Sequence, residues 1–105
     1  MSGEYRTWDI WYARVKFEDS DEVKRRPVVI INQSAYILCL KVTSNPSRNN
    51  CTDEYPLRYW KEAGLSMPST VRLGKKIKLI ESDFDEMIGR LHTNDILLIQ
   101  YRLLP

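Results

Sequence analysis

The sequence predicts a mainly β protein with short helices: a small, strongly bent antiparallel barrel with a C-terminal helix. Several short apolar or alternating runs are separated by polar turn residues, which is typical of small antiparallel barrels. The last segment instead repeats its apolar residues with a helical period. A chain of 105 residues, 43% of them apolar, is expected to form one domain over residues 1–105.

The first strand is expected within residues 8–17, because Trp11, Ala13 and Val15 fall on one face of an alternating pattern. A charged loop follows, and its sign changes from acidic to basic along the chain. We expect Pro27 to begin the second strand, where a missing N–H group is tolerated.

Two apolar runs, residues 28–32 and 36–42, predict a hairpin with its turn near Ser34. This register places Arg26 directly opposite Thr43 at the open end, with the two Cβ atoms about 5 Å apart. Both side chains then point to the same side, away from the main core. A guanidinium beside a hydroxyl is a phosphate-binding arrangement. The core-facing pairs of the same register are Pro27 with Val42, Val29 with Leu40, and Ile31 with Leu38.

The middle of the chain predicts shorter elements. Residues 55–57 indicate a short strand, and residues 58–63 indicate one helical turn that Gly64 would end in a left-handed conformation. Residues 70–80 indicate two strands, or one strand bent at Gly74.

The C-terminal part predicts a brief helical turn, a strand and a helix. Ser82 begins a segment with capping-box spacing, and residues 87–91 indicate a strand. Thr93 is expected to cap a helix over residues 94–104, with Asp95 favouring the positive end of the helix dipole. This helix is apolar on two faces, so it either plugs the barrel or meets a partner subunit. One face carries Ile96, Ile99 and Leu103, and the other carries Leu97, Tyr101 and Leu104.

Charge and cysteine usage exclude several classes of protein. The net charge of +2 is too small for non-specific duplex binding but is compatible with a local basic patch. Cys39 and Cys51 do not suggest a disulfide framework, so a reducing cytoplasm is expected. With His92 as the only histidine, a two-histidine acid–base nuclease within one subunit is excluded, and the ligands for a zinc site are too few. No apolar stretch reaches membrane-spanning length.

Five motifs, in this order and spacing, resemble the PemK/MazF family of toxins from bacterial type II toxin–antitoxin systems. They are Asp9-Ile10-Trp11-Tyr12, Arg26-Pro27-Val28-Val29-Ile30, Val42-Thr43-Ser44, Lys76-Ile77-Lys78-Leu79-Ile80 and Ile88-Gly89-Arg90-Leu91. The glycine-free loop of residues 18–25 departs from the family pattern, and Lys78 stands where an arginine is usual. This loop flanks the active site in the family, so the change leaves substrate preference and activity open.

The resemblance implies an SH3-like barrel, a homodimer, and sequence-specific, ribosome-independent cleavage of single-stranded RNA without metal or cofactor. It implies products with 2′,3′-cyclic phosphate and 5′-hydroxyl ends, and a cognate antitoxin that covers the RNA-binding groove. The family's catalytic arginine and threonine fall on Arg26 and Thr43.

Chemistry assigns different roles to these two residues. Arg26 can stabilise the charge of the transition state bidentately, but it is a poor base because guanidinium stays protonated. Thr43 can donate a hydrogen bond to a phosphate oxygen. The alternatives are a surface ion pair for Arg26 and an ordinary strand end for Thr43. No general base is identified from the sequence.

Several further residues are candidates for RNA binding, by charge, by hydrogen bonding or by base stacking. The alternative for the basic ones is a solvated surface. The main candidates are Lys24, Arg25, Ser44, Asn45, Lys76, Lys78 and Tyr59, with Trp60, Arg72 and Lys75 beside them.

Two other readings remain open on the sequence alone. One is a non-catalytic barrel that binds RNA or inhibits a protein target such as a topoisomerase. The other is an inactive structural dimer. The two-sided helix and the second apolar face of the 28–42 hairpin both favour a dimer. The altered loop favours the binding module, whereas retention of both Arg26 and Thr43 favours the enzyme.

Overall fold

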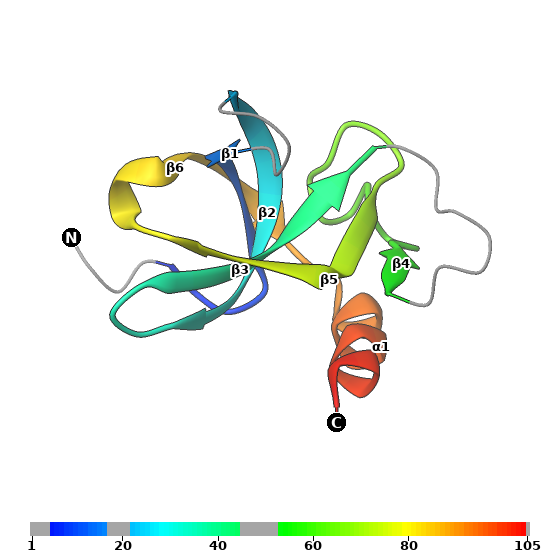
Figure 1. The fold of residues 1–105 in the computed structure, drawn as a ribbon. Coiled ribbons are helices and arrows are strands. Elements are labelled where there is room, and N and C mark those ends of the chain that lie inside the picture. The colour runs from blue at the N-terminus through cyan, green and yellow to red at the C-terminus, as the bar shows by residue number, and fades with distance from the viewer. Residues whose placement is uncertain (1–4, 17–21, 45–52, 105) are drawn as a thin grey trace.

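Six antiparallel strands form one strongly bent sheet in the order β4-β5-β3-β2-β1-β6 (Figure 1). The computed structural model describes residues 5–16, 22–44 and 53–104. The elements are β1 (Asp9–Lys16), β2 (Val23–Gln33), β3 (Ile37–Thr43), β4 (Glu54–Pro56), β5 (Thr70–Leu79), a 3₁₀ turn (Glu81–Asp83), β6 (Phe84–Arg90) and α1 (Thr93–Leu103). The expected mainly β class with a C-terminal helix is confirmed. The edge strands β4 and β6 do not pair, so the barrel stays open.

Both faces of the β2–β3 hairpin are buried, each in a separate core. The helix-side core packs the sheet against α1 and the segment that follows β4, and its buried residues are Ile10, Val29, Leu40, Val42, Tyr55, Leu57, Ala63, Leu65, Val71, Leu73, Leu91 and Ile99. The second core consists of Ala13, Val15, Val28, Ile30, Ile37, Cys39 and Leu79. The second hairpin face is therefore not available to a partner subunit, and that expectation was wrong.

The predicted hairpin register is confirmed only in its middle. Val28 pairs with Lys41 and Val29 with Leu40, as expected. A bulge at residue 31 then shifts the ladder, so that Asn32, rather than Ile31, pairs with Leu38. Towards the open end the ladder stops at Val28, before the expected pairs of Pro27 with Val42 and of Arg26 with Thr43.

Pro27 explains why the ladder stops. It lies inside β2, which begins at Val23, so the expectation that it starts the strand was wrong. The carbonyl of Ile30 accepts a hydrogen bond from the N–H of Trp8 on the β1 side, so by alternation the nitrogen of Pro27 faces β3. Proline has no N–H to donate there. Beyond this point β2 and the end of β3 diverge (Figure 1).

β5 is one strand bent around Gly74, the second of the two expected possibilities. Lys41 pairs with Arg72, whereas the preceding residue of β3, Leu40, pairs with Lys76. Residues 73–75 are therefore extra on β5. An odd number of inserted residues reverses the face on which the following side chains lie.

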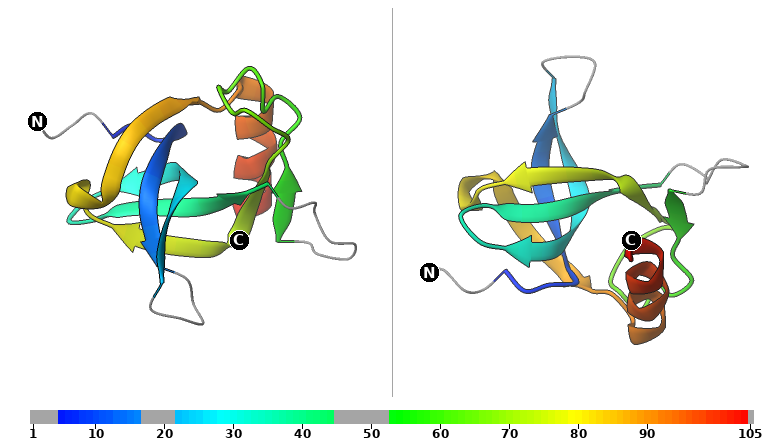
Figure 2. Two further views of the ribbon diagram at one scale, coloured as in Figure 1. Left: turned by 90° about the horizontal axis from the view of Figure 1, so that it is seen from above. Right: turned by 60° about the horizontal axis from the view of Figure 1, so that its bottom comes forward.

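A buried carboxylate joins α1 to the segment after β4. Asp95 is 0% exposed, and it accepts hydrogen bonds from the hydroxyl of Tyr55 at 2.6 Å, the N–H of Arg58 at 3.2 Å and the N–H of Tyr59 at 2.9 Å. Burial is the main cause that raises the pKa of Tyr55, and the hydrogen bond to Asp95 raises it further. Asp95 thereby holds this segment and α1 together beside β4 (Figure 2).

The expected caps are shifted along the chain. The N-cap of α1 is His92 rather than Thr93, because the Nδ1 atom of His92 accepts from the N–H of Asn94 at 3.1 Å. The N-cap of the 3₁₀ turn is Ile80 rather than Ser82, and the carboxylate of Asp83 accepts from the N–H of Ile80 at 3.0 Å. No helix in the described ranges has the length and apolar character needed to cross a bilayer.

The turn after β4 ends as expected at Gly64, whose φ is 99°. The N–H of Leu65 donates to the carbonyl of Trp60, and the N–H of Gly64 donates to that of Lys61, which is a Schellman motif. This turn packs closely against β6. A Cβ atom at Gly89 would overlap the carbonyl oxygen of Ala63. The backbone of β6 therefore approaches the turn closely.

We expect Gly89→Ala to lower the free energy of unfolding by about 1–3 kcal/mol, because a backbone carbonyl must move to admit the methyl group. Urea denaturation of wild type and variant measures the difference. The control is Gly74→Ala, whose nearest atom is a carboxylate oxygen of the exposed Asp53 side chain, which can rotate. An equal or greater loss for Gly74→Ala would contradict this account.

Candidate functional site

The strand pairing places polar side chains from three strands in one row across the sheet. Glu54 of β4 pairs with Arg72 of β5, Arg72 pairs with Lys41 of β3, and Lys41 pairs with Val28 of β2. Directly paired residues project to the same face. Thr43 follows Lys41 by two residues on β3, so its side chain lies on that face as well.

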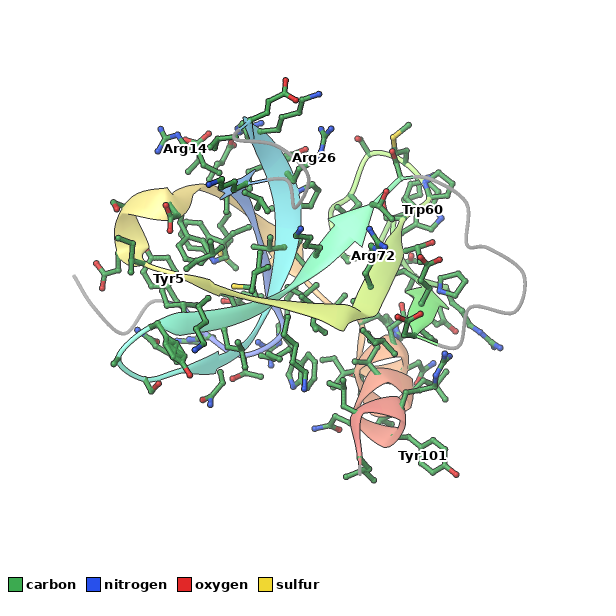
Figure 3. The ribbon with its side chains drawn as sticks, viewed as in Figure 1. Tyr5, Arg14, Arg26, Trp60, Arg72 and Tyr101 are labelled. Carbon is green, nitrogen blue, oxygen red and sulfur yellow. The ribbon has the colours of Figure 1, made fainter. Side chains whose placement is uncertain are left out.

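The same alternation brings two cations of β2 to this face. Arg26 and Lys24 precede Val28 by two and four residues in an unbroken part of β2, paired with Ala13 and Val15 of the second core. We call the residues Lys24, Arg26, Lys41 and Arg72 the basic face. In Figure 3, Arg26 and Arg14 lie on opposite sides of the β1–β2 hairpin, with Arg26 on the side of Arg72.

Some side chains of the basic face are exposed to solvent, and others are held by contacts within the protein. Arg26 is exposed, whereas Lys24, Lys41, Arg72 and Thr43 are half-buried. The Nε atom of Arg72 lies 3.6 Å from a carboxylate oxygen of Glu54, whose side chain is 6% exposed. This ion pair orients the guanidinium of Arg72. Lys24 lies 3.9 Å from Glu22 at the surface, where such a pair contributes little.

The expected pair of Arg26 and Thr43 is thus on one face, although the two residues are not paired in the ladder. Each lies two residues beyond the last pair, Val28 with Lys41. Ser44 follows Thr43 directly and is exposed. Asn45 lies outside the described residues.

Arg25, a predicted RNA-binding residue, lies on the opposite face of β2, where it pairs with Arg14 of β1. Its guanidinium lies 3.9 Å above the ring of Tyr12 and forms ion pairs with Asp85 at 2.5 Å and Glu86 at 3.1 Å. The hydrogen bond to Asp85 is the main cause that raises the pKa of Arg25. These contacts join β2 to β6, so Arg25 has a structural role here.

Lys76 and Lys78, two further predicted RNA contacts, are not on the basic face. Lys76 pairs with Leu40, which lies in the helix-side core, and Lys78 projects to the same side. The amine of Lys78 lies 4.8 Å from the ring centre of Tyr36. The insertion at residues 73–75 explains this reversal.

The aromatic candidates also lie elsewhere. The ring of Tyr59 stacks on His92, with centroids 4.0 Å apart, and its hydroxyl accepts from Asn94 at 3.3 Å. Tyr59 therefore lies at the N-terminus of α1. Trp60 packs against the helix-side core.

Sequence reasoning missed Lys41 and Glu54. Lys41 interrupts an otherwise apolar strand and shares the alternation of Thr43, which was the available signal. Glu54 gave no such signal, because its ion pair with Arg72 depends on the pairing of β4 with β5.

The cysteine that the structure describes is inaccessible to solvent. Cys39 is fully buried, and burial raises the pKa of its thiol to about 12. Cys51 lies outside the described residues. Within the ranges that the structure describes, no three His, Cys, Asp or Glu side chains gather as metal ligands. The basic face can bind phosphate through Arg26, with Thr43 as a hydrogen-bond donor.

Comparison with known proteins gives one family. A model of the "PemK-like, MazF-like toxin of type II toxin-antitoxin system" matches residues 6–104. A search of curated proteins finds no significant match.

Among solved structures, toxin MazF-mt6 of Mycobacterium tuberculosis is similar with a TM-score of 0.70 and 22% identity, covering 90% of this chain and 91% of that one. An endoribonuclease from a mycobacterial species has a TM-score of 0.71 and 10% identity, covering 98% and 91%. A mycobacterial endoribonuclease in complex with its cognate antitoxin has a TM-score of 0.68 and 11% identity, covering 92% and 88%. At these identities the likeness establishes the fold.

Because Arg25 connects β2 to β6, we expect Arg25→Gln to lower the thermal unfolding midpoint. Lys76→Gln, an exposed substitution on β5, is the control and is expected to leave the midpoint unchanged. Differential scanning calorimetry in low and high salt compares them. The deficit of Arg25→Gln should shrink in high salt, where the wild-type ion pairs are already screened. Identical midpoints for all three proteins would show that Arg25 is not structural.

Proposed function

Because the chain belongs to the PemK-like, MazF-like toxin family of type II toxin–antitoxin systems, we propose that it is an endoribonuclease that cleaves single-stranded RNA. The observation that carries this proposal is the common face of Arg26 and Thr43 at the open end of the β2–β3 hairpin. The name of one similar protein, a mycobacterial endoribonuclease, supports the same activity.

The proposed reaction uses the RNA's own 2′-hydroxyl as the nucleophile. Its oxygen attacks the adjacent phosphorus and loses its proton, the bond from phosphorus to the 5′-oxygen breaks, and that oxygen takes up a proton. The products are a 2′,3′-cyclic phosphate and a 5′-hydroxyl end. Arg26 stabilises the charge that develops on the phosphorane, and Thr43 donates a hydrogen bond to a non-bridging oxygen. These roles need only fixed charge and donors, so we propose that the reaction needs no metal ion.

Substrate binding is proposed to use the rest of the same face. Lys24 lies two residues before Arg26 on the same side of β2 and is proposed as a phosphate contact. Ser44 and Asn45 follow Thr43 in the chain and are proposed to contact a base or sugar. Arg25, Lys76, Lys78 and Tyr59 lie away from Arg26 and Thr43, and we do not include them in this proposal.

The proposed partners are a cognate antitoxin and a second copy of the chain. One similar mycobacterial endoribonuclease was solved with its cognate antitoxin, and an acidic antitoxin segment would complement the basic face. For the dimer, the support is the outer face of α1. It exposes Leu97 (58%), Leu98 (40%), Tyr101 (75%) and Leu104 (68%), while Ile99 is fully buried on the opposite side.

We expect wild-type protein to cleave a long single-stranded RNA in excess EDTA, and Arg26→Ala to reduce the rate about 100-fold or more by removing a stabilising charge. Thr43→Val keeps the shape of the side chain without its hydroxyl and is expected to cost about tenfold, with Thr43→Ser restoring activity. Gel electrophoresis with end analysis measures rates and product ends.

The control for the Arg26 and Thr43 variants is Lys76→Ala, on the other face of the sheet. If it loses as much activity as Arg26→Ala, the site is misplaced. If the folded wild type cleaves none of several varied RNAs but still binds RNA or a protein target, the non-catalytic alternative replaces the proposed enzyme.

We expect Tyr101→Asp to convert a dimer into a monomer, because a carboxylate would enter the apolar face of α1. The measurement is light scattering after size exclusion over a range of concentrations. Gln100→Asp, also exposed on α1 but outside the apolar set, is the control. A wild type that is monomeric at every concentration would remove the dimer from the proposal.

A further inference from the structure

We propose that Lys41 and Arg72 form a second phosphate site, which holds the RNA phosphate next to the one that is cleaved. Glu54 is the positioning residue that orients Arg72. This inference rests on the proposed function and adds residues that no family motif in the sequence includes.

Lys41 and Arg72 place two positive charges beside a single carboxylate. Lys41 and Arg72 are direct cross-strand partners, so their Cβ atoms are about 5 Å apart, and like charges at such positions repel. Both residues are half-buried, which reduces screening by water. One carboxylate, Glu54, accompanies Arg72. In the described part of the chain, the side chain of Lys41 makes no ion pair or hydrogen bond. A bound phosphate would relieve this repulsion.

The guanidinium of Arg72 is oriented by the protein but only partly used by it. Its contact with Glu54, at 3.6 Å from Nε, is an ion pair longer than a hydrogen bond. The terminal N–H groups of the Arg72 guanidinium make no hydrogen bond to another described residue. Glu54 itself is fixed, because its side chain is 6% exposed and its carbonyl accepts from Arg102 of α1 at 3.3 Å. Arg72 is therefore oriented while its terminal donors are left for a ligand.

The spacing of side chains along β3 matches the spacing of phosphates in single-stranded RNA. Lys41 and Thr43 are two residues apart on one strand, which corresponds to about 6.6 Å. This is comparable to the separation of neighbouring phosphates along an extended single strand. A strand that presents its scissile phosphate to Arg26 and Thr43 would bring the next phosphate over the pair of Lys41 and Arg72.

The test uses the full chain and variants that differ only in face. Lys41→Met and Lys76→Met remove the same charge from neighbouring rows on opposite faces of the sheet. Lys41→Arg restores the charge, and thermal unfolding checks that each variant is folded. We expect kcat/KM for RNA cleavage to fall about tenfold or more in Lys41→Met and Arg72→Met, mainly through KM. Lys76→Met should match the wild type, and Lys41→Arg should recover most of the loss.

Synthetic RNA identifies the phosphate. Once the wild-type cleavage position is mapped, single uncharged methylphosphonate linkages are placed at each phosphate beside it. One such linkage should slow the wild type to the rate of Lys41→Met and cause no further loss in Lys41→Met. Independent, multiplying losses would overturn the second phosphate site, as would equal behaviour of Lys41→Met and Lys76→Met.

A measurement of RNA binding tests the second phosphate site separately from RNA cleavage. Fluorescence anisotropy with labelled single-stranded RNA gives the dependence of affinity on salt. Loss of one phosphate contact should reduce the slope of log K against log salt by about 0.7. A reduced slope for Lys41→Met but not for Lys76→Met supports the site even if the wild type does not cleave. Equal slopes, or no RNA binding by the wild type, would overturn it.

Discussion

The candidate site exists because Pro27 has no N–H group. Its nitrogen faces β3, so the ladder between β2 and β3 ends at Val28 and Lys41. Had the ladder continued, Arg26 would have paired directly with Thr43. Because it stops, β2 and β3 diverge, and a ligand can approach both side chains. In the dipeptide Arg26-Pro27, the proline ends the pairing of β2 with β3, and the arginine places a positive charge where the two strands separate.

The two cores decide which residues are left for binding. Alternate side chains of the hairpin enter the helix-side core and the second core, so its middle, residues 28–31 and 37–40, is apolar on both faces. At the open end of the hairpin, polar side chains follow the last buried residues on the face of the second core. They are Lys41 and Thr43 on β3 and Arg26 and Lys24 on β2. The helix-side core in turn depends on Asp95, whose three hydrogen bonds attach the segment after β4 to α1.

The sequence patterns predicted mainly those features that depend on residues close together in the chain. Period-two alternation placed Arg26 and Thr43 on one face, and glycine chemistry placed the turn at Gly64 and the bend at Gly74. What failed was non-local. Arg25 is occupied by Asp85 and Glu86, far along the chain. Lys76 and Lys78 changed faces because three residues are inserted on β5, and their number cannot be read from one strand alone.

Net charge says little about binding in such a molecule, because the cations differ in how far the fold already uses them. Arg14 donates to the carbonyl of Ser82, Arg25 is paired with two carboxylates, and Arg90 contacts Asp9. These contacts attach β1 and β2 to neighbouring elements, so the three guanidinium groups already have partners within the protein. On the basic face, by contrast, Lys41 directly opposes Arg72, and the one carboxylate, Glu54, contacts Arg72 from the other neighbouring strand. A fold keeps like charges in that position at some cost to its stability. The net positive charge of the chain is therefore small, yet four cations share the face that Pro27 leaves open.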